Sequence, residues 1–329
     1  MKILITGGTG FIGSRLALKS LEKGHSVELL GQINTTAEQE NQHMLEASGI
    51  KVTLGSVTER EKIARLAQQC DVIFHLAAAQ HEVNVPDQHF WAVNVDGTRN
   101  MLEACIEAKV KWFVHGSTIG VYGSAMEGEM NEDSPLRPDN IYGVTKREGE
   151  RLVLSFADKI PISIVRISET YGPGDRRLLK LFKAIEKNLF FMIGTGDNKH
   201  QLIYVDDLIE GLYLAATAEQ AVGNTFVLAG KEILTTQEMV DIIAKALGTR
   251  LRKFRVPLWP FLVTAVIMEN TLKPMGIQPP LHRRRLDFFR KSFFFSHSKP
   301  SNVLGFQPKT DFVQGVAETV KWYQEHGYL

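Results

Sequence analysis

The sequence has 329 residues, 44% hydrophobic and 23% charged, which is an ordinary globular composition with room for one large domain or two joined ones. The formal net charge of +1 excludes the electrostatic footprint of a nucleic-acid-binding protein. Cys70 and Cys105 are the only cysteines, so a disulfide scaffold is excluded and a reducing cytoplasm is the expected location.

The first half of the chain alternates short β-branched runs with amphipathic segments, which is typical of a parallel sheet covered by helices. The expected strands are Lys2–Thr6, Ser26–Leu30, Lys51–Leu54, Val72–Leu76, Trp112–Gly116, Ile162–Arg166 and Thr225–Leu228. The expected helices between them are Phe11–Lys23, Glu59–Gln69, Phe90–Ala108 and Ile141–Ala157. The pattern therefore predicts an α/β protein with a doubly wound sheet.

After Arg166 the alternation becomes less regular. Two further helices are expected, Asp207–Ala218 and Thr236–Leu247, and the second opens on the capping-box pair Thr235 and Glu238. From Leu251 onward prolines are mixed with apolar residues, which predicts an irregular cap over a pocket. We expect residues 1–168, completed by about 201–230, to form a nucleotide-binding domain, and residues 169–200 and 231–329 to form a substrate-binding domain.

Two apolar runs bear on membranes and targeting. Ile3 to Ile5 runs straight into glycines, which predicts no secretory signal. Phe261–Met268 is far shorter than the roughly 20 apolar residues that a membrane span needs. With Trp259 and the basic residues Arg283, Arg284, Arg285 and Lys291 it could make weak peripheral contact with a bilayer. The simpler interpretation, the core of a second domain with a solvated basic face, is favoured.

A glycine turn follows the first strand. Gly7, Gly10 and Gly13 are spaced G-x-x-G-x-x-G, and the helix expected after them opens at Phe11 and Ile12. Glycine allows the tight turn and a close approach of the backbone to a pyrophosphate, and the helix start offers unpaired N–H groups and a positive dipole end. The turn therefore predicts a dinucleotide site.

Tyr142 and Lys146 lie four residues apart, hence on one face of the expected helix. A free tyrosine, with a pKa near 10, is a poor base at neutral pH. A fixed ammonium nearby favours the phenolate and lowers that pKa. The pair can then exchange a proton with a carbonyl or an alcohol as hydride moves to or from a nicotinamide.

Together these motifs resemble the extended short-chain dehydrogenase/reductase family, of the NAD-dependent epimerase/dehydratase type. The resemblance also covers Leu76-Ala-Ala-Ala79, the N-x-x-G-T run that starts at Asn94, V-Y-G at 121–123, E-D-S-P-L-R-P at 132–138, Tyr171-Gly-Pro-Gly-Asp175 and Tyr204-Val-Asp-Asp207. The tail is most similar to the 3-beta-hydroxysteroid dehydrogenase-like branch. The resemblance implies a Rossmann fold with a smaller C-terminal cap, and a homodimer joined through Phe90–Ala108 and Ile141–Ala157.

The resemblance implies a nicotinamide cofactor but leaves NAD and NADP open. Gly31 stands where an acidic residue would select NAD, and Gln32 follows it, so NADP is slightly favoured. Ser56 stands where relatives often carry an aspartate that contacts adenine. The residues expected at the cofactor are Gly7, Gly10, Phe11, Ile12, Gly13, Gln32, Ser56, Val57, Leu76, Ala77, Ala78, Tyr142, Lys146 and Ile167.

On the substrate side, the family places a serine or threonine three residues before V-Y-G. That residue is Thr118, with Ser117 as the competing assignment. Dehydratases carry an Asp-Glu pair directly afterwards, and here Ile119 and Gly120 replace it, which weighs against dehydration. His200 stands where epimerases usually have an arginine for the substrate diphosphate. The residues expected at the substrate are His81, Ser117, Glu169, Arg177 and His200.

The sequence has no cluster with metal-ligand spacing, so no metal is expected. The leading hypothesis is an NAD(P)-dependent dehydrogenase or reductase with Thr118, Tyr142 and Lys146 as catalytic residues. Its substrate would be a small molecule, a secondary alcohol or ketone on a bulky, lipophilic, for example sterol-like, skeleton. The alternatives are a nucleotide-sugar epimerase of the same family and a non-catalytic NAD(P)-binding sensor.

Overall fold

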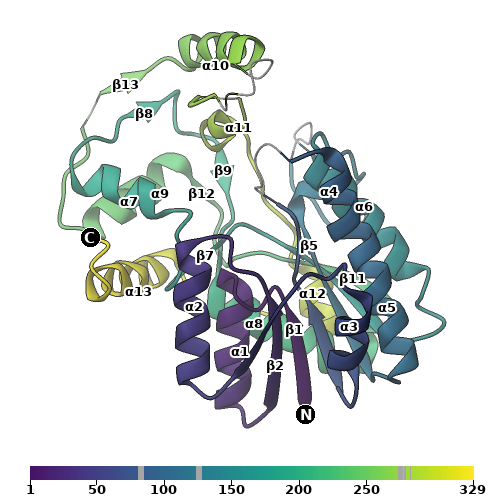
Figure 1. The fold of residues 1–329 in the computed structure, drawn as a ribbon. Helices are drawn as coiled ribbons and strands as arrows, with labels where there is room; N and C mark the ends of the chain where they lie inside the picture. The colour runs from purple at the N-terminus through teal and green to yellow at the C-terminus, as the bar shows by residue number, and fades with distance from the viewer. Residues whose placement is uncertain (81–84, 124–127, 253, 273–276, 278, 282) are drawn as a thin grey trace.

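The structure is a computed structural model that describes residues 1–80, 85–123, 128–252, 254–272, 277, 279–281 and 283–329. Its centre is a seven-stranded parallel sheet with the strand order β11-β6-β5-β4-β1-β2-β3 (Figure 1). The strands are β1 (Lys2–Thr6), β2 (Ser26–Gly31), β3 (Lys51–Leu54), β4 (Val72–His75), β5 (Trp112–Thr118), β6 (Ile162–Ile167) and β11 (Asn224–Leu228). The predicted doubly wound α/β fold is confirmed.

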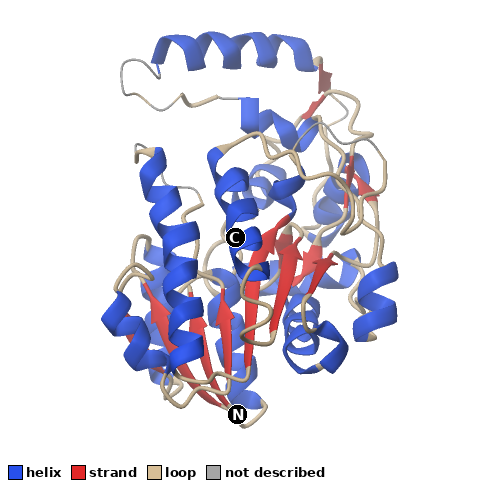
Figure 2. Ribbon diagram, turned by 90° about the vertical axis from the view of Figure 1, so that its right-hand side faces the viewer, coloured by secondary structure: helices blue, strands red, loops and turns tan. Residues whose placement is uncertain are grey.

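Helices cover both faces of this sheet, as Figure 2 shows from the side. On one face, α1 (Phe11–Glu22), α2 (Thr36–Ala47), α8 (Val205–Thr217) and α12 (Ser298–Leu304) pack against the strands. On the other face lie α3 (Arg60–Ala67), α5 (Gly97–Glu107) and α6 (Ile141–Leu154). The strands are buried on both sides, which explains why they read as continuous apolar runs.

The strand order reverses between β1 and β4, and in sheets of this kind ligands bind at the carboxyl edge beside such a reversal. The glycine turn lies there. Gly7 has φ +70°, and a Cβ on it would lie 2.8 Å from the backbone nitrogen of Ala77. Only glycine fits this close approach of the turn to the end of β4.

The remaining elements form a second layer above the carboxyl edge of the sheet. The helices α7 (Leu179–Glu186), α9 (Thr236–Ala246) and α13 (Phe312–Glu325) share one apolar core, and α10 (Leu258–Leu272) and α11 (Arg283–Leu286) share another. Short strand pairs join these parts: β7 (Thr170–Tyr171) with β10 (Ile203–Tyr204), β8 (Met192–Ile193) with β13 (Arg255–Val256), and β9 (Lys199–His200) with β12 (Leu234–Thr235).

Three features differ from the sequence-based expectations. A helix not expected, α2, begins at Thr35, which forms a capping box with Glu38. The expected single helix over Phe90–Ala108 is α4 (Asp87–Trp91) and α5 joined by a π-helical turn, Ala92–Asp96. The prediction of an irregular cap after Leu251 is wrong where α10 and α13 form, because their apolar residues pack at helical spacing.

No helix in the described part of the chain has the length and apolarity needed to cross a bilayer.

The close approach at Gly7 gives a direct test. We expect Gly7→Ala to lower the free energy of unfolding by about 2–4 kcal/mol, because a positive φ and a collision with the end of β4 add together. Gly24→Ala is the matched control, because Gly24 also has a positive φ (+77°) but nothing within 4 Å of an added Cβ. It should cost only about 1 kcal/mol. Urea unfolding measures both, and equal losses would contradict the steric argument.

Candidate active site

The predicted acid–base residues lie at the carboxyl edge of the sheet. Thr118 ends β5, and Tyr142 is in the first turn of α6, whose N-cap Asn140 accepts a hydrogen bond from the Gly143 N–H at 3.0 Å. A Cβ placed on Gly120 would lie 3.4 Å from the Thr118 hydroxyl and 3.9 Å from the Tyr142 ring. The structure therefore brings Thr118 and Tyr142 together around Gly120, and the Thr118 hydroxyl accepts a 3.0 Å bond from the Gly120 N–H.

Lys146 lies one helical turn after Tyr142, and its side chain is almost completely buried, at 1% exposure. Its Nζ is 3.4 Å from Nε2 of His115 on β5. Burial lowers the pKa of Lys146 to about 8, against an opposing effect of the Glu150 carboxylate. Burial, and then the charge of Lys146, lower the pKa of His115 as well, so this imidazole is neutral beside the ammonium.

The carboxylate of Glu150 accepts hydrogen bonds from several side chains close to Lys146 and His115. Glu150, on α6, accepts two hydrogen bonds from the Arg166 guanidinium, at 3.0 and 2.9 Å to different oxygens, and a 2.5 Å bond from the Ser117 hydroxyl. Arg166 also donates to the Tyr122 hydroxyl at 2.9 Å. Ser117 was expected at the substrate, but its buried hydroxyl points to Glu150, which favours Thr118 as the residue beside a substrate oxygen.

A series of buried hydrogen bonds that sequence reasoning missed joins β1, just before the glycine turn, to α6. Thr6 on β1, in register with His75 on β4, contacts its Nδ1 at 2.8 Å, and His75 Nε2 lies 3.0 Å from the Thr98 hydroxyl. Thr98 donates to the backbone oxygen of Asn94. Burial, then the charge of Lys146, lower the pKa of His75 to about 3, so its ring stays neutral within the chain.

Asn94 is the last residue in this series of hydrogen bonds, and it acts as a clamp between two segments of the protein. It lies in the π-helical turn, where its side chain accepts from the Ala79 N–H and donates to the Ala79 carbonyl, at 2.9 and 3.0 Å. It also donates to Thr145, the residue before Lys146, at 2.9 Å. Asn94 therefore fixes the loop after β4 relative to α6. The N-x-x-G-T motif contained this signal, but its spacing alone does not show which groups the asparagine holds.

The residues expected at a dinucleotide fit such a group. Helix α1 begins after Gly10 with no side-chain cap and no acidic residue in its first turn, so the first N–H groups, at Phe11 and Ile12, have no acceptor within the helix. The unpaired N–H groups at the start of α1 would favour the binding of a phosphate group there. Leu76 and Ile167 flank Gly116, whose added Cβ would lie 2.6 and 3.7 Å from their side chains.

The adenosine end has a steric feature that the sequence did not reveal. A Cβ on Gly31 would lie 2.6 Å from the Thr9 hydroxyl, which itself donates to the Gln32 carbonyl at 2.7 Å. The end of β2 therefore has no room for an acidic side chain. Gln32 is exposed just beyond it, Ser56 accepts hydrogen bonds from Thr58, and Val57 is buried in the core against Gly97.

Three predicted substrate residues lie together after β6. Glu169 forms an ion pair with Arg177 at 3.6 Å, and its carboxylate lies 3.3 Å from Nδ1 of His200. Although burial raises it, the pKa of Glu169 falls to about 2 because of the hydrogen bond to His200 and the charge of Arg177. His200 is almost completely buried, so its ring is not open to a substrate anion. His81, the other expected substrate residue, lies outside the described residues.

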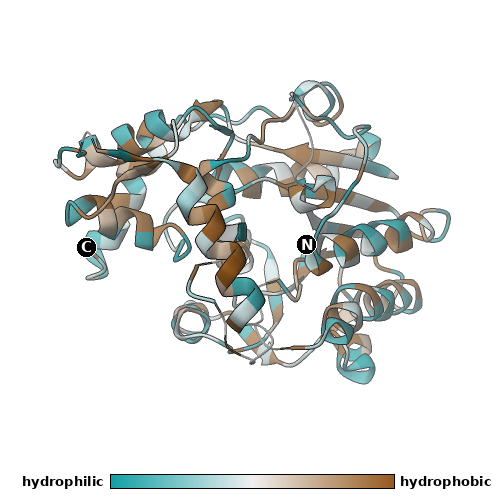
Figure 3. Cartoon of the chain, turned by 90° about the horizontal axis from the view of Figure 1, so that it is seen from above, coloured by the Kyte–Doolittle hydropathy of each residue, from teal (hydrophilic) through white to brown (hydrophobic). Residues whose placement is uncertain are grey.

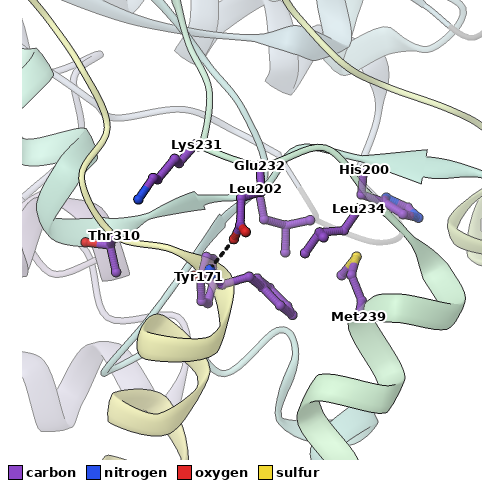
Figure 4. A pocket seen from close by; sticks show the side chains of 9 residues that line it. Tyr171, His200, Leu202, Lys231, Glu232, Leu234, Met239 and Thr310 are labelled. Carbon is purple, nitrogen blue, oxygen red and sulfur yellow. Dashed lines mark hydrogen bonds between the residues drawn. The ribbon is translucent and has the colours of Figure 1, made fainter.

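Two pockets in the described part of the chain lie away from Tyr142. One, of about 10 Å³, is lined by Tyr171, His200, Lys231, Glu232 and their neighbours, and Glu232 accepts from the Phe312 N–H across it (Figure 4). It has room for roughly one water molecule. The other is an open groove beside Arg255, Leu258 and Phe289. Among the described residues no group of three or more potential ligands could hold a metal ion.

A doubly wound sheet, a glycine turn before an uncapped helix, and a Tyr-x-x-x-Lys pair at the carboxyl edge define a nicotinamide-dependent enzyme of the extended short-chain dehydrogenase/reductase class. The model of the NAD dependent epimerase/dehydratase family matches residues 3–229, and the chain belongs to this family.

Several relatives and solved structures are similar along most of the chain. An uncharacterized UDP-glucose epimerase of Bacillus subtilis is 30% identical over 76% of this chain and 83% of its own. A dTDP-glucose 4,6-dehydratase of an Actinoplanes species is 28% identical over 98% of both chains. The crystal structure of a UDP-glucuronic acid 4-epimerase of Bacillus cereus with NAD has a TM-score of 0.81, at 26% identity, and covers 99% of both chains.

These comparisons narrow two expectations. The family is NAD-dependent, and NAD is the cofactor named with the Bacillus cereus structure, so the slight preference for NADP has no support. The sterol-like substrate also has no support, whereas the alternative of a nucleotide-sugar epimerase agrees with the names of the similar proteins.

The buried Lys146 predicts a specific pH dependence. Between pH about 8 and 10.5 the unfolded chain keeps a proton that the folded chain has lost, so the free energy of unfolding rises with pH. Relative to Lys146→Met, we expect the cofactor-free wild type to gain roughly 3 kcal/mol over this range. Urea unfolding of both proteins at several pH values measures the difference. A constant difference would contradict the lowered pKa.

Proposed function

We propose that this chain is an NAD-dependent epimerase that oxidises a secondary alcohol of a nucleotide sugar to a ketone and reduces it again from the opposite face. The observation that carries the proposal is the convergence of Thr118, Tyr142 and Lys146 at the carboxyl edge of the sheet, beside the glycine turn. When bound, NAD would accept the hydride from the alcohol carbon and return it.

The chain's own residues would handle the proton. Tyr142 would take the hydroxyl proton as hydride leaves the carbon and give it back as hydride returns. Thr118 would hold the same oxygen through its hydroxyl. The Lys146 ammonium would favour the phenolate of Tyr142 by its charge, and it would donate to the nicotinamide ribose. Ile119 and Gly120 follow Thr118 and carry no proton-transfer group, so elimination of water is not part of the proposal.

The epimerase alternative, rather than a sterol dehydrogenase, is supported by the polar lining on the substrate side. Glu169 and Arg177 lie after β6 as an ion pair whose side chains are 31% and 45% exposed. A lipophilic skeleton that covered this pair would desolvate both charges without replacing their contacts with water. Because His200 is almost completely buried, a substrate diphosphate would have to rely on Arg177, whose side chain is 45% exposed.

The fate of the cofactor tests this proposal. With NAD and UDP-glucuronic acid or UDP-glucose, we expect proton NMR to detect the C4 epimer without net formation of NADH. Tyr142→Phe should lower turnover by at least about a hundredfold, because general acid–base catalysis is lost. Tyr213→Phe is the matched control, since this tyrosine bonds Ser20 between α8 and α1, away from the site, and its loss should leave turnover unchanged.

Two results would point to the other candidates. Stoichiometric NADH from a secondary alcohol would identify a dehydrogenase. NAD binding with no turnover of any such substrate, and no effect of Tyr142→Phe on it, would favour a sensor.

We also propose a homodimer through α5 and α6, in a cytoplasmic protein with the domain division predicted from the sequence. Ile106 on α5 and Leu154 on α6 are exposed apolar residues on these adjacent helices, which supports a contact there.

We expect wild type to be a dimer at micromolar concentration by light scattering and the double variant Ile106→Glu with Leu154→Glu to be a monomer. Leu189→Glu, at an apolar position in the other half that is even more exposed (63%), should remain dimeric. A monomeric wild type would refute the proposal.

A further inference from the structure

Helix α10 lies at the end of the molecule farthest from the amino-terminal strand, at the top of Figures 1 and 2. Its inner face packs Ala265, Leu258 and Phe261 against Leu286 and Ile193. Its outer face carries apolar residues at helical spacing, and these residues are exposed to solvent. Trp259 is 67% exposed, Val263 50% and Ile267 56%, and Val266 lies beside them. Figure 3, from above, shows the apolar residues along this helix.

The outer face of α10 is also uncharged. Glu269 is the only ionisable residue between Leu258 and Leu272, and it is buried. Its carboxylate accepts hydrogen bonds from the backbone N–H and the Nε of Arg283 on α11, at 2.7 and 3.0 Å. A water-facing helix normally carries charges on its outer side. Here the one charge is turned inward and neutralised.

Charge in the sequence is strongly segregated around this helix. Residues 250–291 contain ten basic and two acidic residues, a net charge of +8. The other 287 residues contain 28 basic and 35 acidic residues, a net charge of −7, which the total of +1 conceals. Arg250 and Arg252 are exposed before α10, and Arg283 and Arg290 are exposed after it, where they pair with Glu269 and Asp287. The side chains of Arg284 and Arg285 lie outside the described residues.

We propose that α10 docks this protein on the surface of an anionic lipid bilayer, lying in the interface with Trp259, Val263 and Ile267 among the acyl chains. An exposed apolar helix face with a tryptophan, flanked by arginines that can reach headgroups, has the features of an interfacial helix. The negative remainder of the chain would be directed away from the lipid. This proposal is independent of the proposed epimerase activity.

A second copy of the chain fits this face less well. A two-fold contact would place two segments of net charge +8 against each other, which is unfavourable. The dimer surface proposed above lies on α5 and α6, which flank the sheet, so both faces can be used at once. Two molecules joined there would each keep α10 open.

Vesicle flotation tests the proposal on the full-length protein. We expect wild type to float with vesicles of phosphatidylcholine containing about one third phosphatidylglycerol, and at least tenfold less with pure phosphatidylcholine. Val263→Ser with Ile267→Ser should lower the partition coefficient on anionic vesicles at least tenfold. Leu189→Ser with Val313→Ser is the matched control, because these side chains are 63% and 58% exposed elsewhere on the molecule, and it should bind like wild type.

Two further readouts separate lipid insertion from other causes. NAD binding by calorimetry should be unchanged in all variants, which shows that they fold. Brominated acyl chains should quench the protein's fluorescence, and Trp259→Phe should remove most of this quenching while keeping the apolar face. The proposal is overturned if wild type does not float, if it floats equally with neutral vesicles, or if the α10 variant binds like wild type. A lower oligomeric state in that variant would instead identify α10 as a contact between copies.

Discussion

The site depends on keeping a buried positive charge next to a tyrosine. Lys146 and Arg166 are both almost fully buried, and Glu150 provides a carboxylate between them. Burying ions is costly unless they are paired and hydrogen-bonded, so α6 must stay tightly against β5 and β6. Gly149 brings α6 close to β5 and to the π-helical turn, because a Cβ there would lie 3.5 Å from the His115 ring and 3.0 Å from the backbone oxygen of Asn94. Any loosening of this contact would admit water and restore the lysine to its ordinary basicity.

The same contact is tied to the nucleotide side of the molecule. Thr6, His75 and Thr98 form an unbroken line of hydrogen bonds from β1 to the π-helical turn, and Asn94 continues it to α6. Buried polar networks that are fully bonded rigidify a core and define one arrangement of it. The glycine turn therefore keeps a constant spacing from α6, which carries Tyr142 and Lys146.

Most of the sheet and the glycine turn could be predicted from the sequence, because parallel strands buried on both faces read as apolar runs and glycine marks the turn. Helix α2 was not predicted because only Leu45 on it is buried, which makes its apolar periodicity weak. The capping-box spacing of Thr35 and Glu38 was the one local signal for it. The helices α10 and α13 were not predicted because the prolines around them indicated an irregular segment. The clamp made by Asn94 and the exclusion at Gly31 arise from contacts between distant segments, which no local pattern encodes.

The contact between Thr9 and Gly31 has a consequence for how this protein can evolve. A side chain at position 31 would enter the space of the Thr9 hydroxyl, and Thr9 in turn holds the Gln32 carbonyl and receives the Asn41 amide through its own carbonyl. The two positions are therefore coupled: a side chain at position 31 requires Thr9 to move or to become smaller. The segment that begins at Gln32 is exposed, so a residue that contacts the ribose is introduced there with less disturbance of the packing.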